Sequence, residues 1–347
     1  MKVLVVAPSW IGDAVAAQPL FRRLHERYPR LDLDVLAPSW VAPVLARMPE
    51  VRRVIPSPFA HGELNLGGRW RLGRHLAAEG YAEAFVLPNS WKSALIPWFA
   101  RIAVRVGYCG EARYGLINRR HVLDERATPQ IAERYAQLAE SPGASLRRPL
   151  PAPRLQTNPV RQNETLARLG AFGDPMPIAF CPGAEYGPAK RWPPEYYAAL
   201  AKRLIARGHA IWLIGSAKDA GQAAQIARDA PARNLCGTTT LDQAIDLLAC
   251  ARFVVTNDSG LMHVAAALDR PMLALFGSSS PRFTPPLSAQ AQVLWLKLEC
   301  APCFARECPL GHFRCMREIT PEQADERIRP RLAELVAAHA APMTSEH

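Results

Sequence analysis

The 347 residues allow two ordinary domains, each large enough to bury its own core without disulfide or metal staples. Hydrophobic residues make up 49% of the chain and charged residues 21%, which excludes a disordered protein, and no apolar run reaches the roughly 18–20 residues of a transmembrane helix. The formal net charge of +11 favours a polyanionic partner: nucleic acid, anionic lipid headgroups, or a phosphorylated or carboxylated glycan.

Local sequence narrows these options. The basic residues occur singly or in short pairs, without a basic tail or an aromatic-rich binding motif, which argues against nucleic acid. The apolar run in Met1–Pro8 is too short for a secretory signal, and no small-residue cleavage site follows it. Cys181, Cys236 and Cys250 lie in apolar segments where a reduced thiol packs as a small hydrophobe. We therefore expect a cytoplasmic protein.

The N-terminal half alternates buried strands with segments of helical length and pattern. This β-α repetition predicts a doubly wound parallel sheet. The expected strands are Val3–Val6, Leu33–Leu36, Val51–Ile55, Ala84–Leu87 and Val104–Val106, and the expected helices are Ala14–Tyr28, Trp40–Met48, Trp70–Ala78 and Ser90–Phe99.

A second series follows the proline-rich linker candidate Pro149–Pro153 and a polar helix at Asn158–Leu169. The sequence thus predicts an α/β protein of two Rossmann-like domains, over 1–155 and 156–320, and a C-terminal helical segment over 321–347. An amphipathic helix at 321–341 is expected there, in a position to pack back on the first domain. The strands of the second series are Ile178–Cys181, Ile211–Ile214, Phe253–Thr256 and Met272–Phe276, and its helices are Pro194–Arg207, Asp219–Arg228, Leu241–Cys250 and Gly260–Leu268.

The first strand runs into a loop that contains Trp10, Gly12 and Asp13. Open α/β sheets bind ligands at the carboxyl ends of their strands, and this loop lacks the glycine-rich dinucleotide fingerprint. A carboxylate beside a flexible glycine can accept a proton from a sugar hydroxyl as general base. The alternative is that Asp13 only caps the following helix.

The second domain opens with a glycine- and proline-shaped loop, residues 182–193, that carries Gly183 and Lys190. A lysine on such a loop is suited to neutralising a departing diphosphate. The alternative is a lysine on the solvated surface.

A sharper signal is the motif Asn257–Gly260, where a strand ends and a helix begins at once. Free backbone N–H groups and the helix dipole converge there, which predicts a diphosphate-binding turn at Ser259 and Gly260 with His263 one turn later. Asp258 either caps the helix or accepts hydrogen bonds from sugar hydroxyls, and a purely structural N-cap is the alternative for the motif.

Two further loops follow strands of the same domain. Gly215 and Ser216 lie in one of them, and residues 236–239 form the other. Both can line the base and ribose of a nucleotide, or they are ordinary βα turns.

Cys300, Cys303, Cys308 and Cys315, with His312 among them, lie close together in the sequence. Four soft ligands in a short segment leave a structural zinc site open, although the spacing departs from regular paired C-x2-C patterns. Reduced or redox-active thiols are the alternative.

The motifs around Asp13, Lys190 and Asp258 together closely resemble those of the ADP-heptose:lipopolysaccharide heptosyltransferases, and the likeness covers nearly the whole chain. Further stretches are similar to the family members that extend the first heptose of the core. The segments that carry the likeness are Ser9–Asp13, Val86–Leu95, Gly110–Leu116, Pro182–Ala184, Lys190–Pro193, Asn257–His263 and Phe283–Ser288.

The resemblance implies a GT-B fold, in which two Rossmann-like domains face a cleft. It implies an inverting glycosyltransferase of a Gram-negative bacterium that moves L-glycero-D-manno-heptose from ADP-heptose to the first heptose of a Kdo-heptose lipid A acceptor. It also implies a cytoplasmic enzyme in peripheral contact with the inner membrane, with no cofactor and no nucleic-acid partner. The positive charge then suits the Kdo carboxylates and the anionic leaflet.

The same resemblance assigns roles to residues. Asp13 is the general base and Lys190 the catalytic cation, and interdomain closure is expected to assemble the site. The donor residues are Gly183, Lys190, Gly215, Ser216, Asp258, Ser259, Gly260 and His263, and the acceptor residues are Trp10, Gly12, Asn89, Lys92 and Arg113.

Two other functions stay open from the sequence alone. One is a related transferase that uses another nucleotide-sugar donor or a different core acceptor. The other is a zinc-stapled nucleic-acid binder, built on the basic charge and the four clustered cysteines.

Overall fold

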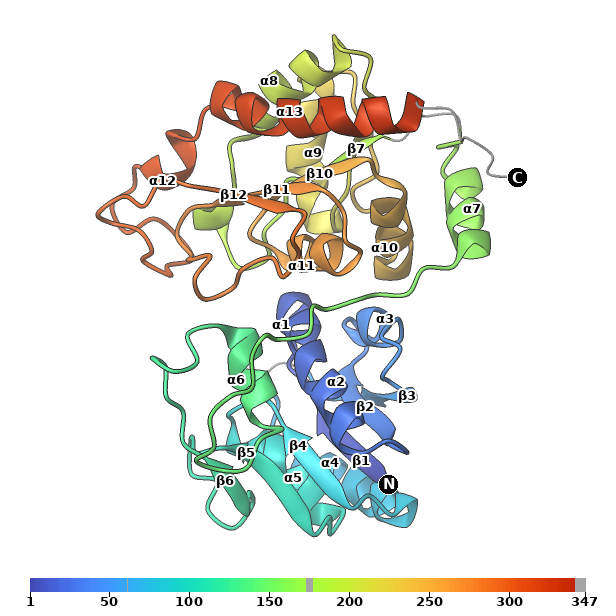
Figure 1. Ribbon diagram of the computed structural model, residues 1–347, viewed down its shortest axis with the longest axis vertical. Helices are drawn as coiled ribbons and strands as arrows, with labels where there is room; N and C mark the ends of the chain where they lie inside the picture. Colours follow the sequence, from blue (N-terminus) through green and yellow to red (C-terminus); the bar gives the residue numbers. More distant parts are fainter. Residues whose placement is uncertain (61, 173–176, 341–347) are drawn as a thin grey trace. The chain divides into compact units, whose positions relative to one another are not determined.

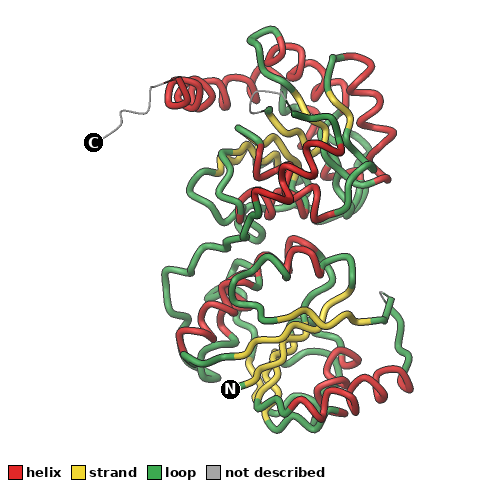
Figure 2. The backbone as a smooth tube through the Cα atoms, turned by 90° about the vertical axis from the view of Figure 1, so that its right-hand side faces the viewer, coloured by secondary structure: helices red, strands yellow, loops and turns green. Residues whose placement is uncertain are grey.

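The computed structural model describes residues 1–60, 62–172 and 177–340. The chain divides into two compact units, and the first comprises Met1–Gln156 together with the short segment Arg282–Thr284. The second comprises Thr157–Pro281 and the chain from Pro285 onward. Figures 1 and 2 show that each unit has one layer of strands with helices packed on both sides.

The first unit is built on a six-stranded sheet in the order β3-β2-β1-β4-β5-β6. Every pair of neighbouring strands is parallel, and the order is that of a Rossmann fold. The strands are β1 (Lys2–Val6), β2 (Asp32–Pro38), β3 (Arg53–Ser57), β4 (Glu83–Val86), β5 (Val104–Tyr108) and β6 (Arg119–His121), and the helices are α1 (Ile11–Ala16), α2 (Gln18–Arg27), α3 (Ala42–Leu45), α4 (Leu66–Leu76), α5 (Trp91–Phe99) and α6 (Ile131–Gln137).

The second unit repeats this architecture with the order β12-β11-β10-β7-β8-β9, again all parallel. Its strands are β7 (Ile178–Cys181), β8 (Ile211–Leu213), β9 (Arg233–Asn234), β10 (Phe253–Asn257), β11 (Met272–Phe276) and β12 (Ala291–Trp295), and its helices are α7 (Pro159–Arg168), α8 (Pro194–Ile205), α9 (Ala220–Asp229), α10 (Leu241–Cys250), α11 (Gly260–Ala267), α12 (Arg314–Arg317) and α13 (Pro321–Ala340).

The predicted α/β class is confirmed, and most central strands lie where their apolar runs predict them. Strands β6, β9 and β12 were not predicted; they are short or partly polar and lie at sheet edges. An edge strand is buried less completely, so it lacks the continuous apolar run of a central parallel strand. The single helix expected at Ala14–Tyr28 is divided into α1 and α2, with Pro19 near the start of α2.

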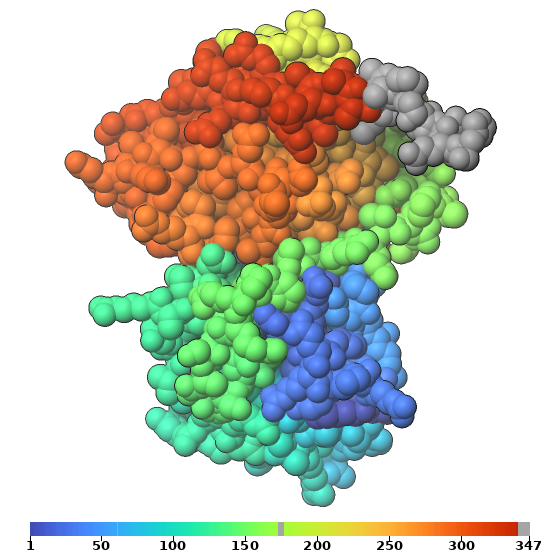
Figure 3. All heavy atoms as spheres, viewed as in Figure 1, coloured from blue at the N-terminus to red at the C-terminus, as the bar shows by residue number. Residues whose placement is uncertain are grey.

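The expectation that the C-terminal helix covers the first domain is wrong. Helix α13 packs against α8 and β11 of the second unit, along whose surface it runs in red in Figure 3. Ile328 and Leu332 on its apolar stripe are buried in the core of that unit, so the stripe is already covered there. Ala341, the last residue of the expected helix, lies outside the described residues.

An ion pair ties α13 to the turn that follows α8. Both guanidinium Nη atoms of Arg207 donate to the Asp325 carboxylate at 2.6 Å, and Asp325 is only 5% exposed. This bond to Arg207 lowers the pKa of Asp325 from its ordinary value, with burial acting in the opposite direction.

Among the described residues, no helix is both long and apolar enough to span a bilayer.

We expect Asp325→Asn to destabilise the protein at neutral pH. A carboxyl whose pKa is lowered by folding contributes stability above its unfolded pKa, and that contribution disappears as the pH falls through the folded value. Because Arg207 is partly exposed, the loss should be about 1–2 kcal/mol. Urea unfolding at several pH values measures it, and a loss that persists undiminished in acid would contradict the assignment. Glu334→Gln, which removes an exposed ion pair to Arg331 on the same helix, is the matched control.

Candidate active site

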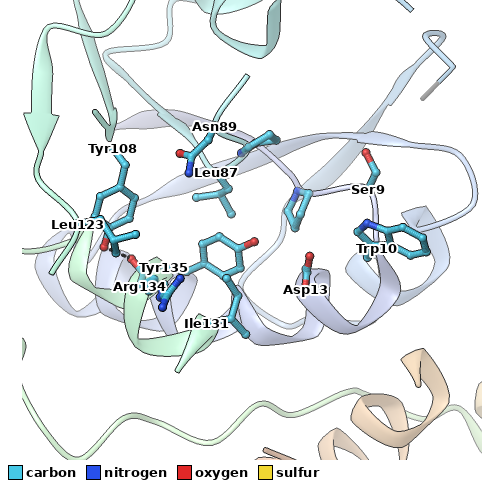
Figure 4. Close-up of a pocket in the computed structure, with 12 residues that line it drawn as sticks. Ser9, Trp10, Asp13, Leu87, Asn89, Tyr108, Leu123, Ile131, Arg134 and Tyr135 are labelled. Atoms are coloured by element: carbon cyan, nitrogen blue, oxygen red, sulfur yellow. Dashed lines mark hydrogen bonds between the residues drawn. The ribbon is translucent and has the colours of Figure 1, made fainter. Parts of the chain in front are cut away.

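In the first unit, a pocket lies where the strand order reverses. The sheet places β1 beside β4, so the loops that follow these two strands meet at the carboxyl edge, the position at which doubly wound sheets bind ligands. The cavity has a volume of about 290 Å³. It is lined by Pro8, Ser9, Trp10, Asp13, Leu87, Pro88, Asn89, Tyr108, Leu123, Ile131, Arg134 and Tyr135 (Figure 4).

Asp13 stands in the first turn of α1 and lines this pocket. The Tyr135 hydroxyl points toward the side of the pocket that carries Asp13 (Figure 4). Burial first, and the Asp13 charge second, raise the pKa of Tyr135 well above its ordinary value, so this hydroxyl stays protonated and can donate. A carboxylate that lines a pocket, with a phenol nearby, is suited to accept a proton from a bound hydroxyl.

The predicted acceptor residues have different positions. Trp10 and Asn89 line the pocket, whereas Gly12, Lys92 and Arg113 are not among its lining residues. The Lys92 ammonium instead donates to the Gly62 carbonyl at 2.8 Å.

Arg113 is a buried support beneath the pocket. It is 3% exposed, and it donates to the Pro88 carbonyl at 2.8 Å and to the Asn89 side chain at 3.3 Å. A third bond goes to the Tyr108 carbonyl. Burial lowers the pKa of the Arg113 guanidinium. Its hydrogen bonds hold the loop with Pro88 in position.

Helix α6 forms a wall of the pocket that was not predicted. Ile131, Arg134 and Tyr135 line the pocket, and the Tyr108 hydroxyl donates to the Arg134 carbonyl at 2.6 Å. The Phe283 carbonyl accepts from the Ile131 N–H at 3.0 Å. The Arg134 guanidinium lies over the Phe283 ring. The one local signal was the capping box of Gln130 and Glu133, which is weak because glutamine is an uncommon N-cap.

In the second unit, the predicted donor residues gather at the carboxyl ends of three adjacent strands. The sheet places β10, β7 and β8 side by side, so the loops with Asp258, Gly183 and Gly215 follow neighbouring strands. The Lys190 ammonium donates to Asp258 Oδ2 at 2.6 Å, with the carboxylate 4% and the lysine side chain 16% exposed. Lys190 Nζ also lies 5.1 Å from the centre of the Tyr186 ring.

This ion pair decides between two interpretations of these residues. Lys190 is not a solvated surface lysine, because it is held at the switch point between β7 and β10. Asp258 accepts hydrogen bonds from Lys190 and from the Ser279 hydroxyl rather than capping α11.

Ser279 was not predicted, although it belongs to the serine run 278–280 directly after β11, a signal that the sequence carried. Its neighbour Ser278 has a buried hydroxyl with no hydrogen-bond partner among the described residues.

Asn257, the last residue of β10, connects the loops of the second unit. Its amide donates to the Pro182 carbonyl at 2.6 Å, and its carbonyl oxygen accepts from the Trp192 N–H at 3.2 Å and from the Tyr197 hydroxyl at 3.1 Å. The side chain is fully buried. Asn257 therefore holds the segment from Pro182 to Trp192, which carries Lys190, against the Asp258–Gly260 turn.

The Asp258–Gly260 turn opens helix α11. Ser259 occupies the N-cap position in extended conformation, and its side chain makes no capping hydrogen bond. The first amides of the helix are therefore not satisfied by the cap, as an anion-binding turn requires. His263 is buried, and burial lowers its pKa to about 4, so its imidazole is neutral at physiological pH.

Gly183 is required by close packing against Asp219. A Cβ at position 183 would lie 2.4 Å from the Asp219 carboxyl carbon. The Asp219 carboxylate in turn accepts from the backbone N–H and the hydroxyl of Ser216, at 2.9 and 2.7 Å. The buried Asp219 carboxylate thus contacts both adjacent loops, the one with Gly183 and the one with Ser216.

In the structure, the four clustered cysteines are not arranged as metal ligands. Among the described residues, no group of three or more His, Cys, Asp or Glu side chains can hold a metal ion. All eight cysteines of the chain are free thiols. The pKa of the Cys308 thiol is lowered. Desolvation raises this pKa, but hydrogen bonds from the backbone N–H groups of residues 310–313 together outweigh that effect.

These two Rossmann-like units, with a carboxylate pocket in one and a helix start without a side-chain cap in the other, are typical of nucleotide-sugar glycosyltransferases. Residues 69–314 match glycosyltransferase family 9 (heptosyltransferase), and the chain belongs to this family. It is 47% identical to lipopolysaccharide heptosyltransferase 2 of Salmonella typhimurium, over 96% of this chain and 99% of that protein.

Two further comparisons support the same family. The chain is 43% identical to lipooligosaccharide heptosyltransferase 2 of Haemophilus influenzae, over 96% of this chain and all of that protein. Its structure is similar to that of ADP-heptose lps heptosyltransferase II from E. coli, with a TM-score of 0.87 and 44% identity over 98% of this chain and 100% of that one. The predicted family and GT-B fold are confirmed.

We expect Gly183→Ala to destabilise the protein by about 1–3 kcal/mol, because the added methyl group would push the Asp219 carboxylate out of its bonds with Ser216. Gly221→Ala, on α9 with open space around its Cβ position, is the matched control and should be neutral or slightly stabilising. Chemical denaturation of both variants provides the comparison, and equal stabilities would contradict the packing argument.

We expect the imidazole of His263 to stay neutral between pH 5.5 and 8 in the unliganded protein, because its pKa of about 4 lies below this range. NMR titration of the histidine ring protons, assigned with a His263→Gln variant, measures this. A midpoint near the unperturbed value of about 6.5 would refute the assignment.

Proposed function

We propose that this protein transfers L-glycero-D-manno-heptose, with inversion, from ADP-heptose to the first heptose of the lipopolysaccharide inner core. The observation that carries the proposal is the Lys190–Asp258 ion pair beside the open N-terminus of α11, at the strand ends where a nucleotide diphosphate would bind. The support for the sugar and the acceptor is the near-full-length similarity to proteins named heptosyltransferase 2.

In the first unit, Asp13 is the proposed general base. Its carboxylate would take the proton from the acceptor hydroxyl while that oxygen attacks the anomeric carbon of the heptose. The Tyr135 hydroxyl, kept protonated by burial, is placed to orient the carboxylate or the acceptor. Trp10 and Asn89, which line the same pocket, are the best-supported acceptor contacts.

In the second unit, the departing ADP would receive its stabilisation from Lys190 and from the amides of Ser259 and Gly260. Charge that develops on the leaving oxygen is stabilised most by donors already held in place. Asp258, whose carboxylate also accepts from the Ser279 hydroxyl, holds the Lys190 ammonium in this way. The neutral His263 would act as a hydrogen-bond donor to phosphate rather than as a cation.

The proposed acceptor also implies a location. A lipid-linked core oligosaccharide lies at a membrane, so we propose that the enzyme works in the cytoplasm and contacts the inner leaflet peripherally. The net charge of +11 supports attraction to both the anionic leaflet and an acidic acceptor.

Paired variants test the proposed roles. Asp13→Asn should reduce heptose transfer by about 10²–10⁴-fold and leave ADP-heptose affinity nearly unchanged, because a general base acts only in the chemical step. Lys190→Met should instead weaken ADP binding by about tenfold or more, since it removes a charge-assisted bond. Transfer assays and calorimetric ADP titrations separate the two effects.

Lys202→Met is the matched control for Lys190→Met, because Lys202 is an exposed lysine on the neighbouring helix α8. An Asp13→Asn enzyme with unchanged transfer would refute the base assignment. Preferential thermal stabilisation by UDP- or GDP-sugars over ADP-heptose would favour the alternative of another donor.

A further inference from the structure

We propose that the outward side of helix α4 in the first unit is a docking surface for an anionic lipid bilayer. This inference rests on the proposed function for its biological setting, since it names the part of the protein that would meet the membrane carrying the acceptor. Figure 1 shows α4 beside α5.

The outward side of α4 carries large apolar side chains. Leu66 is 50% exposed and Trp70 is 53% exposed. They are four residues apart, and Arg74 follows after four more, so the three side chains lie on one face of the helix. A tryptophan and a leucine exposed together on one helix face form an apolar patch of the kind that marks an interaction site.

The opposite side of α4 is firmly packed. A Cβ at Gly73 would lie 2.4 Å from Phe99 Cβ, so the helix approaches α5 closely there, and Leu76 is buried. Near the helix start, the buried Arg69 donates to the Leu64, Glu63 and Lys92 carbonyls and lies over the Phe59 ring. Because these contacts fix the inner side, Leu66 and Trp70 stay exposed while α4 remains in its place.

The charge on α4 specifies the kind of partner. The helix sequence LGGRWRLGRHL contains three arginines and one histidine and no Asp or Glu. Arg71, Arg74 and His75 are exposed. The acidic residues that flank the helix are engaged: Glu63 accepts from the Ala60 N–H and the Asn65 amide, and Glu79 pairs with Arg53 and Lys2.

The neighbouring helix carries exposed side chains of the same kinds. Gly73 packs on the end of α5, which carries Trp98, 45% exposed, and is followed by the exposed Arg101. Tryptophan rings bind at the boundary between headgroups and acyl chains, while arginine heads pair with lipid phosphates. This combination fits an anionic bilayer better than an acidic protein, which would offer no apolar layer for an exposed tryptophan.

The test is cosedimentation of the full-length protein with vesicles of phosphatidylcholine alone or of phosphatidylcholine with phosphatidylglycerol. We expect binding to the anionic vesicles only, weakening as salt is raised. Arg71→Ala combined with Arg74→Ala should reduce the partition coefficient by at least about tenfold, because each arginine near such a surface contributes about fivefold. Leu66→Ala combined with Trp70→Ala should reduce it by about tenfold or more through lost apolar insertion.

Val160→Ala is the matched control. Val160 is 65% exposed on α7 of the second unit, and its loss should leave vesicle binding unchanged. Thermal unfolding and transfer to a detergent-solubilised acceptor check that each variant is folded and active.

Unchanged vesicle binding by both double variants would overturn the proposal, as would failure of the wild-type protein to bind anionic vesicles. Self-association that disappears in the Leu66→Ala, Trp70→Ala variant, without vesicle binding, would assign the surface to a second copy and also overturn it. In each case transfer to the solubilised acceptor reports on the proposed function separately.

Discussion

The second unit depends on one buried amide. Asn257 makes three hydrogen bonds with groups from different parts of the chain: the Pro182 carbonyl, the Trp192 N–H and the Tyr197 hydroxyl. A buried amide left unpaired would cost stability, so each of these bonds stabilises the arrangement. They align the segment that carries Lys190 with the turn that carries Asp258, and the ion pair between those two residues follows from that alignment.

In the first unit, a different buried residue holds the loops at the carboxyl edge of the sheet. Its pocket also lies between the first and fourth strands of a Rossmann sheet, and the loop after β4 needs support from below. The buried Arg113 provides it through bonds to the carbonyls of Pro88 and Tyr108. In both units, one buried polar side chain thus fixes the loops at the topological switch point.

Sequence patterns predicted the central strands because parallel strands covered on both faces must be apolar throughout, as in Val3–Val6 and Phe253–Thr256. They missed the edge strands β6, β9 and β12, where that requirement is relaxed. These patterns also did not foresee α6 or Ser279, and the family resemblance placed Arg113 at the acceptor. Whether an arginine supports a loop or meets a substrate depends on which carbonyl groups surround it, and this depends on contacts between distant segments.

By itself, the sequence determined the parallel α/β class, the two-fold repetition of the fold, and the loops that carry Asp13, Lys190 and Asp258. These features depend on local patterns: apolar runs, glycine and proline positions, and residues at strand ends. Only the tertiary structure decided that Lys190 pairs with Asp258, that Tyr135 faces the pocket of Asp13, and that α13 belongs to the second unit. Those outcomes depend on burial and pairing between residues far apart in the chain, which no local pattern records.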